Sequence, residues 1–274
     1  MKLPLYQVDA FTDRLFGGNY AAVMPLPHWL DNAVLQAIAA ENNVSETAFL
    51  VEQQPGHFAI RWFSPLAEID FCGHATLASA HVLFSRDPAC QALTFSAAAV
   101  GDLQLTRGES GLIHMSAPLL PPVAVTQAPP ELLAGLSLSP EQVLVSDQAW
   151  FALYPDEDAV HALQADPQLL ARLAPRDVVA TAPGREVDFV SRYFWPANGG
   201  LEDMVTGSIH AGLAPLWAER LGRRTLHAYQ ASARGGHLYC EVGADRVQIS
   251  GHAVLYLEGL VHLPEGLEGA VSVA

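Results

Sequence analysis

The chain has few cysteines, and they follow no motif. Its 274 residues include three, Cys72, Cys90 and Cys240. An odd number without paired spacing fits neither a disulfide framework nor a structural zinc site. Unpaired thiols are typical of a reducing compartment, so we expect a cytoplasmic protein.

Basic residues are also scarce. The 14 Lys and Arg against 29 Asp and Glu give a formal net charge of −15. Nucleic acids and anionic membrane surfaces both favour dense Lys and Arg. No apolar run reaches the roughly 18–20 residues of a membrane span, and residues 1–6 lack the apolar region of a signal peptide. We therefore expect neither a nucleic-acid nor a membrane partner.

Several catalytic templates are missing as well. The sequence contains no phosphate loop, no Gly-x-Gly-x-x-Gly, no His-Glu-x-x-His and no Gly-x-Ser-x-Gly. The 11 histidines show no metal spacing beyond His74 and His81. We predict no metal site and no cofactor, and a serine hydrolase is not expected.

The chain does contain an internal repeat. The aromatic segment Arg61–Pro65 recurs as Arg192–Pro196, and Glu68 and Glu202 follow, each five residues before a glycine. The period is near half of the chain, whereas solenoid repeats span roughly 20–50 residues. With 50% hydrophobic residues, a sizeable core is expected. The repeat therefore predicts two duplicated domains.

Each copy continues from its glycine, Gly73 or Gly207, into an apolar segment. The pattern predicts helices from His74 to about Phe84 and from Ser208 to about Leu221, both apolar nearly all round. Such a helix must be covered on every side, so we expect a sheet curled around each. Glycine at a helix start lets an anion approach the backbone N–H groups. With a pseudo-twofold axis between the domains, both helix starts can face one interdomain cleft.

The fold class that we predict is α+β. Two similar domains each consist of a curled, mostly antiparallel or mixed, barrel-like sheet around a central buried helix. A proline-rich segment near residues 117–130 divides the chain into domains at 1–117 and 118–263, with 264–274 considered as a further strand of the first. Strands are expected near residues 3–11, 21–24, 44–51, 57–63, 93–97, 101–107, 112–116, 143–145, 150–153, 178–182, 187–194, 224–230, 237–242, 246–250 and 252–257.

Glu46 and His74 are candidates for acid–base chemistry. Glu46 stands where the chain enters an apolar strand, and it is either an exposed loop glutamate or a partly buried general base and acid. His74 is either a structural first-turn histidine or a group that handles a proton. A position at a helix N-terminus is expected to lower its pKa and favour the neutral imidazole.

Asp203 and Ser208 flank the second glycine. Asp203 is either an acid that interacts with the positive helix end or a second carboxylate across the cleft from Glu46. Ser208 is either an ordinary first-turn residue or a hydroxyl donor beside an anion site.

Short motifs along nearly the whole chain point to one family. They are Val8–Phe11, Phe16–Asn19, Asn43–Phe49, Gly73–Thr76, Glu202–Ser208, Gly235–Gly236 and Val247–Gly251. Together they resemble the PhzF-like isomerase family of phenazine biosynthesis. Tyr20 and Met204 depart from the pattern, since family members often have proline there. The resemblance implies a diaminopimelate-epimerase-like fold, a homodimer, and catalysis without cofactor or metal on a small carboxylate-bearing substrate.

The resemblance also implies roles for single residues. Glu46 shuttles a proton along the substrate, while His74 and Asp203 assist the transfer and bind substrate. The implied substrate-binding residues are Gly73, Gly207, Ser208, Asn19 and Ser45.

Two alternatives remain beside the isomerase. A two-thiol epimerase of the diaminopimelate-epimerase type needs a cysteine in each half. Cys72 lies at the first site, but the second reads Met204-Val205-Thr206, so we predict that Cys72 is not a catalytic base. The other alternative is a non-catalytic small-molecule binding protein that has this fold, because fold does not fix function.

Overall fold

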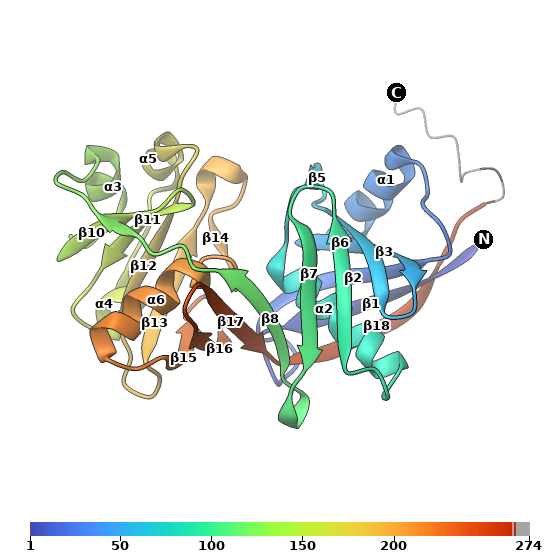
Figure 1. Cartoon of the computed structure of the whole chain (residues 1–274). Coiled ribbons are helices and arrows are strands. Elements are labelled where there is room, and N and C mark those ends of the chain that lie inside the picture. The colour runs from blue at the N-terminus through green and yellow to red at the C-terminus, as the bar shows by residue number, and fades with distance from the viewer. Residues whose placement is uncertain (265, 267–274) are drawn as a thin grey trace. The chain divides into compact units, whose positions relative to one another are not determined.

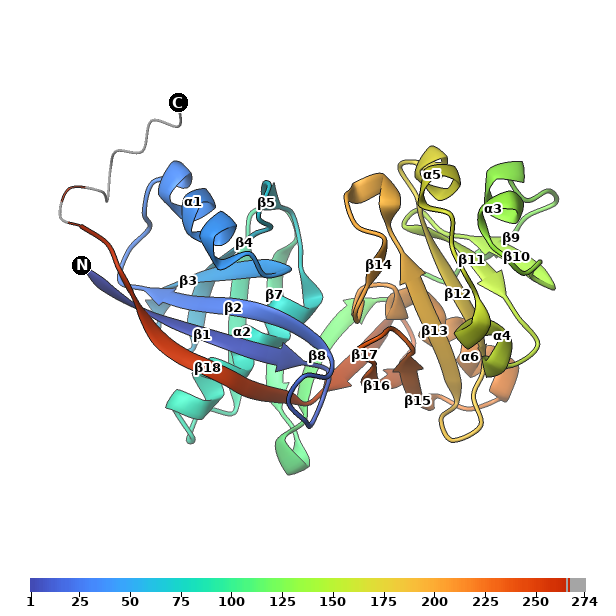
Figure 2. The same cartoon turned by 180° about the vertical axis from the view of Figure 1, so that it is seen from behind.

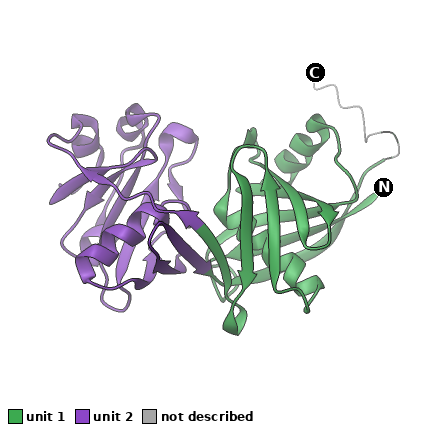
Figure 3. Cartoon of the chain, viewed as in Figure 1, with its two compact units in different colours: residues 1–116, 251–274 green, residues 117–250 purple. Residues whose placement is uncertain are grey.

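The computed structural model describes residues 1–264 and 266. The chain divides into two compact units, residues 1–116 with 251–274 and residues 117–250 (Figure 3). From the sequence we placed residues 251–263 in the second domain. In the structure β18 (Ala253–His262) instead pairs along β1 (Lys2–Ala10) in unit 1, where Figure 2 shows them side by side. Apart from residues 264 and 266, the strand considered at 264–274 lies outside the described residues.

Unit 1 is a mixed sheet with the strand order β18-β1-β2-β3-β4-β6-β7-β8 (Figure 1). Its other strands are β2 (Asn19–Leu26), β3 (Glu46–Gln54), β4 (His57–Phe63), β5 (Glu68–Ile69), β6 (Ala92–Ala97), β7 (Gly101–Arg107) and β8 (Ile113–Pro118). The pairs β2–β3 and β4–β6 are parallel and are joined by α1 (Asn32–Asn42) and α2 (Gly73–Arg86). Within the described residues β18 and β8 are not paired with each other, so the sheet is curled but open.

The helix α2 lies inside this curl. Eleven of its 14 residues are buried, and it contacts β1, β2, β3, β7 and β18. The buried hydroxyls of Thr76 and Ser79 donate to carbonyls one turn back, at 2.6 and 2.7 Å. These bonds let polar side chains stay in an apolar setting without unpaired groups.

Unit 2 repeats the strand plan of unit 1 step by step. Strands β10 to β17 follow the pairing of β1 to β8, with parallel pairs at β11–β12 and β13–β15 and α6 as the central helix. The strands are β9 (Val123–Ala124), β10 (Gln142–Val145), β11 (Ala149–Leu153), β12 (Asp177–Pro183), β13 (Phe189–Phe194), β14 (Glu202–Asp203), β15 (Thr225–Gln230), β16 (Gly236–Val242) and β17 (Arg246–Gly251). The α-helices are α3 (Pro130–Gly135), α4 (Glu157–Ala162), α5 (Pro167–Leu170) and α6 (His210–Leu221).

The predicted fold class is confirmed, with a correction at one helix start. The strand predicted at 57–63 and the strand at 101–107 have those bounds, and Asn43 caps α1 in the left-handed region with φ 49°. The central helix of unit 2 begins at His210, not at Ser208. Gly207–Ile209 form a tight turn in which the His210 N–H donates to the Gly207 carbonyl at 3.1 Å. No helix of the described chain is long and apolar enough to span a membrane.

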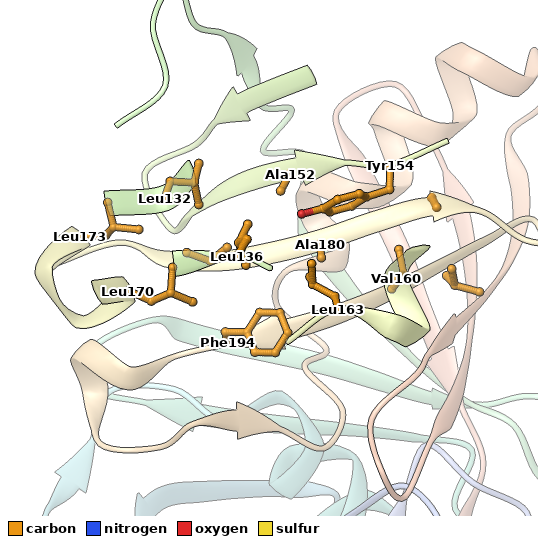
Figure 4. Packing of buried hydrophobic residues seen from close by; sticks show 13 residues of the cluster. Leu132, Leu136, Ala152, Tyr154, Val160, Leu163, Leu170, Leu173, Ala180 and Phe194 are labelled. Carbon is orange, nitrogen blue, oxygen red and sulfur yellow. The ribbon is translucent and has the colours of Figure 1, made fainter. Parts of the chain in front are cut away.

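A second apolar layer covers the outer face of each sheet. In unit 1, α1 packs Val34, Leu35 and Ile38 into a cluster with residues of β1 to β4. In unit 2, the short helices α3, α4 and α5 bury Leu132, Val160 and Leu170 in a cluster with residues of β11 to β13, among them Phe194 (Figure 4). Each sheet is therefore buried on both faces, which fits its long apolar strands.

The repeat also preserves an ion pair. Arg61 makes a bidentate pair with Glu68 at 2.7 and 2.6 Å, and Arg192 makes one with Glu202 at 2.8 and 2.8 Å. Only Arg192 also donates to main-chain carbonyls, those of Val160 and Leu163 at 3.2 and 2.6 Å. The glutamate side chain is 43% exposed in the first pair and 20% in the second.

These differences predict unequal stabilities for matched substitutions. Arg192→Met leaves a half-buried carboxylate and two carbonyls unpaired, so we expect it to lower the free energy of unfolding by about 2–4 kcal/mol. Arg61→Met removes an exposed pair, with an expected loss below about 1 kcal/mol. Urea unfolding followed by fluorescence measures both, and equal losses would contradict this account.

Candidate functional site

A buried polar cluster lies at the first turn of α2 in unit 1. Glu46 is the first residue of β3 and pairs in parallel register with Ala21 of β2. Cys72 and His74 flank Gly73, where the chain turns from extended backbone into the helix. The three side chains belong to residues that are 8%, 6% and 6% exposed, which rules out the exposed-loop interpretation of Glu46.

The cluster converges on one carboxylate oxygen. Glu46 Oε2 lies 2.9 Å from His74 Nε2, and the Cys72 thiol donates to the same oxygen at 3.6 Å. Cys72 Sγ also lies 3.5 Å from His74 Nδ1. No hydrogen bond to the other oxygen of Glu46, Oε1, is found among the described residues.

Asn19 and Ser45 fix the state of the histidine. The Ser45 hydroxyl donates to Asn19 Oδ1 at 3.2 Å, which turns the Asn19 amide NH₂ toward His74 Nδ1 at 3.1 Å. A ring nitrogen that accepts from an amide carries no proton, so the proton of a neutral His74 sits on Nε2 and faces Glu46. Donors therefore run in one direction, from Ser45 through Asn19 and His74 to the Glu46 carboxylate.

The expected pKa of His74 needs a correction. Burial lowers it, but the adjoining Cys72 and Glu46 outweigh burial and raise the pKa of His74 well above its usual range. Burial, with the Glu46 charge, raises the pKa of the Cys72 thiol to about 11. Cys72 is therefore a neutral thiol at pH 7, and Glu46 is the charge that acts on His74. The position at the helix start, from which we expected a lowered pKa, is the weaker influence.

Unit 2 holds Asp203 in a separate network. The Thr206 hydroxyl donates to Asp203 Oδ2 at 2.6 Å. Gln230 accepts from the Thr206 N–H at 2.8 Å and donates to the Asp203 carbonyl at 2.9 Å. The buried Gln230 thereby holds the loop after β14 in place, although this loop has Met204 where family members often have proline.

Ser208 belongs to another chain of hydrogen bonds. Gln148 donates to Ser208 Oγ at 2.9 Å and to the Tyr193 hydroxyl at 3.2 Å. Tyr193 donates to Asp177 Oδ2 at 2.7 Å. Burial raises the pKa of Asp177, although its bonds from Tyr193 and Asn198 oppose this. Asp203 and Ser208 thus have different partners within unit 2.

Asp177 was missed from the sequence, although a signal for it exists. It opens β12 as Glu46 opens β3, and the neighbouring pairs Val178–Phe194 and Thr47–Phe63 occupy equivalent registers. Asp177 precedes Arg192 by 15 residues, as Glu46 precedes Arg61. Extending the repeat toward the N-terminus of each copy would have paired the two carboxylates.

The cluster in unit 1 could also hold a metal ion. One ligand atom each from Glu46, Cys72 and His74 lies within 4.8 Å of the other two, which is found for no other set of three such residues in the described chain. As it stands, the arrangement can move a proton, because it places a carboxylate beside an imidazole N–H at 2.9 Å.

The state of Cys72 predicts its reactivity. A thiol with a pKa of about 11 has roughly 100-fold less thiolate at pH 8 than an ordinary cysteine. Iodoacetamide should therefore modify Cys72 at least ~100-fold more slowly than the partly exposed Cys90, as peptide mass spectrometry would measure. Preferential modification of Cys72 would show that it is a thiolate.

Comparison with known proteins agrees with this architecture. The family model for phenazine biosynthesis-like protein, PhzC-PhzF, matches residues 8–259. An uncharacterized isomerase of Pseudomonas aeruginosa is 46% identical over 265 residues, which cover 96% of this chain and 100% of that protein. The crystal structure of a PhzF-family protein from Enterococcus faecalis superposes with a TM-score of 0.91 at 43% identity, covering 96% of this chain and 100% of that one.

A more distant structure supports the fold alone. A predicted epimerase of Pseudomonas aeruginosa has a TM-score of 0.75 at 23% identity, over 96% of this chain and 100% of that one. The fold is therefore of the diaminopimelate-epimerase-like type. With the family model over most of its length and relatives matched end to end, the chain belongs to the PhzF family of phenazine biosynthesis-like proteins.

Proposed function

We propose that this protein is a cofactor-independent isomerase that moves a proton within a small carboxylate-bearing metabolite, with Glu46 as the base. The observation that carries the proposal is the convergence of donors on Glu46 Oε2 while Oε1 has no partner. A base of this kind can take a proton from carbon at one position and return it at another. The isomerase name of the relative in Pseudomonas aeruginosa supports the class.

The neighbours of Glu46 have separate roles in this mechanism. His74, through Nε2–H, stabilises the carboxylate before it takes the proton and orients it toward the substrate. Asn19 and Ser45 keep His74 in the tautomer that can donate from Nε2. The Asn19 amide nitrogen lies 3.1 Å from His74 Nδ1, and the Ser45 hydroxyl lies 3.2 Å from Asn19 Oδ1. Once Glu46 has taken the proton from the substrate, it is a neutral carboxylic acid. His74 then holds this acid in position to return the proton to another carbon of the substrate.

The remaining residues from the sequence prediction are proposed to bind substrate. Gly73 and Gly207 leave room for an anion beside backbone N–H groups. Ser208 is a hydroxyl donor, because its oxygen accepts from Gln148 and its own proton is left to point elsewhere. Asp203 is proposed to assist proton transfer. As the resemblance implies, we also propose a homodimer that works in the cytoplasm.

The two-thiol epimerase is a weaker fit. The position equivalent to Cys72 in unit 2 is Thr206, since each directly precedes the glycine that follows five residues after the repeated glutamate. Cys72 itself is protonated at neutral pH, with a pKa of about 11. Neither residue therefore supplies the thiolate that such a mechanism needs.

The role of Glu46 can be tested before the substrate is known. Small carboxylic acids incubated with the protein in D₂O should include one that gains deuterium, as detected by mass spectrometry. Glu46→Gln keeps the shape and removes the base, so exchange should slow by roughly 10²–10⁴. Glu41→Gln, on the exposed side of α1, is the control and should exchange normally.

The outcome for Glu46→Gln distinguishes the candidate bases. Exchange within a few fold of wild type would overturn the assignment, and Asp203 would become the better candidate. Asp203→Asn belongs in the same series for that reason. A loss in both variants, with Glu41→Gln unaffected, fits a base at Glu46 assisted by Asp203.

Independence from a cofactor is a separate prediction. Extensive dialysis against EDTA should not lower the rate of deuterium exchange, because no step of the mechanism needs a metal. Loss of exchange on dialysis, with recovery on adding one divalent metal back, would contradict the cofactor-independent proposal.

A further inference from the structure

The three side chains at the start of α2 have the spacing of a tetrahedral metal site. Sγ of Cys72 lies 3.6 Å from Glu46 Oε2 and 3.8 Å from His74 Nε2. Zinc bound at 2.0–2.3 Å to oxygen, nitrogen and sulfur places such ligand atoms roughly 3.3–3.7 Å apart. Only the distance from Oε2 to Nε2, 2.9 Å, is shorter, and opening it by roughly half an ångström makes room for an ion.

The ligand types select the metal. A thiolate, an imidazole and a carboxylate together suit Zn²⁺, whereas Mg²⁺ and Ca²⁺ prefer oxygen ligands. A thiolate and a carboxylate also balance the charge of Zn²⁺, which matters at a site where the three residues are at most 8% exposed. On binding, the Cys72 thiol loses its proton to solvent and the sulfur gains a bond to zinc.

The surroundings can adjust to a bound ion. When Nε2 binds zinc, its proton moves to Nδ1, which then donates. Turning the Asn19 amide over presents Oδ1 to Nδ1–H and the NH₂ group to Ser45 Oγ, which can accept. The Asn19 carbonyl oxygen would then accept from Nδ1–H of the ligand histidine, and Ser45 would hold the Asn19 amide in place. Histidines that bind metals commonly donate their second ring N–H to an acceptor of this kind.

We propose that Glu46, Cys72 and His74 form a reversible Zn²⁺ site, and that zinc bound there inhibits the protein by occupying its proton-transfer carboxylate. The inhibitory part rests on the proposed function, because it requires Glu46 to be the base. The binding part does not, since it rests on the three ligand atoms alone. Zinc is in this view a ligand of the resting site and not a participant in the reaction.

Binding is tested with ZnCl₂ and metal-free protein by isothermal titration calorimetry. Wild type should bind one ion per chain at this site. Cys72→Ser and Cys72→Ala should each weaken that binding at least ~100-fold, more than the loss of a supporting residue costs. Cys90→Ala, which removes a more exposed thiol, should bind as wild type does, and MgCl₂ should give no binding.

A spectroscopic measurement identifies the ligand directly. CoCl₂ should give a sulfur-to-cobalt charge-transfer absorption in wild type and Cys90→Ala that is missing in Cys72→Ser. Equal melting temperatures without metal would show that the variants are folded. Zinc binding to Cys72→Ser within a few fold of wild type, or no saturable binding to wild type, would overturn the site.

Inhibition is measured by the deuterium exchange described above. Zinc should stop exchange in wild type and EDTA should restore it. Unchanged exchange with zinc bound would overturn the inhibitory part and leave the site standing. An active Glu46→Gln variant would instead show that the proposed function is wrong, whatever the zinc titration gives.

Discussion

The helix α2 has no polar face, and the rest of unit 1 is arranged to cover it. A sheet that surrounds a helix must curl, and the polar side chains of Asn19, Glu46 and His74 then lie together near the start of α2. Asn19 and Glu46 are the first residues of β2 and β3, and both reach the start of α2, where His74 lies. The apolar character of the helix thus brings the polar cluster of unit 1 to the start of α2. Burial there lowers the effective dielectric constant, so each hydrogen bond and each charge interaction is stronger than it would be at the surface.

Unit 2 shows what the same strand plan does with other residues. Glu46 and His74 touch directly, whereas the residues in their places, Asp177 and Ser208, are joined only through Tyr193 and Gln148. In the first arrangement the carboxylate accepts from His74 and Cys72. In the second, the carboxylate is engaged by Tyr193 and Asn198. The two units therefore share the framework and the Arg–Glu pair, while the residues before their central helices differ in type and in hydrogen bonding.

Much of the fold could be predicted because its signals are local. Proline and glycine mark the turns, and the repeat reveals the duplication. The pairing of β18 with β1 could not be predicted, because the sequence of a strand does not indicate which distant strand it pairs with. At the site, Glu46 and His74 could be chosen from the sequence because one begins an apolar strand and the other follows the glycine at a helix start. Nothing in the local sequence indicated that Asn19 and Ser45 set the tautomer of His74. Nor did it indicate that Cys72 contacts both Glu46 and His74. The pKa of His74 was misjudged because the helix start is visible in sequence and a neighbouring carboxylate from β3 is not.

The pairing of β18 with β1 bears on how the chain folds as it is made. Lys2 pairs with His262, so one edge of β1 stays unpaired on the ribosome until β18 has been synthesised. Unit 2 is continuous in sequence, from residue 117 to 250. Synthesis of its last strand is therefore complete before synthesis of β18, the last strand of unit 1, begins. Contacts between distant residues form slowly, and domains generally fold as units during synthesis. The unit that holds Glu46 therefore begins to be translated before unit 2 and is completed after it.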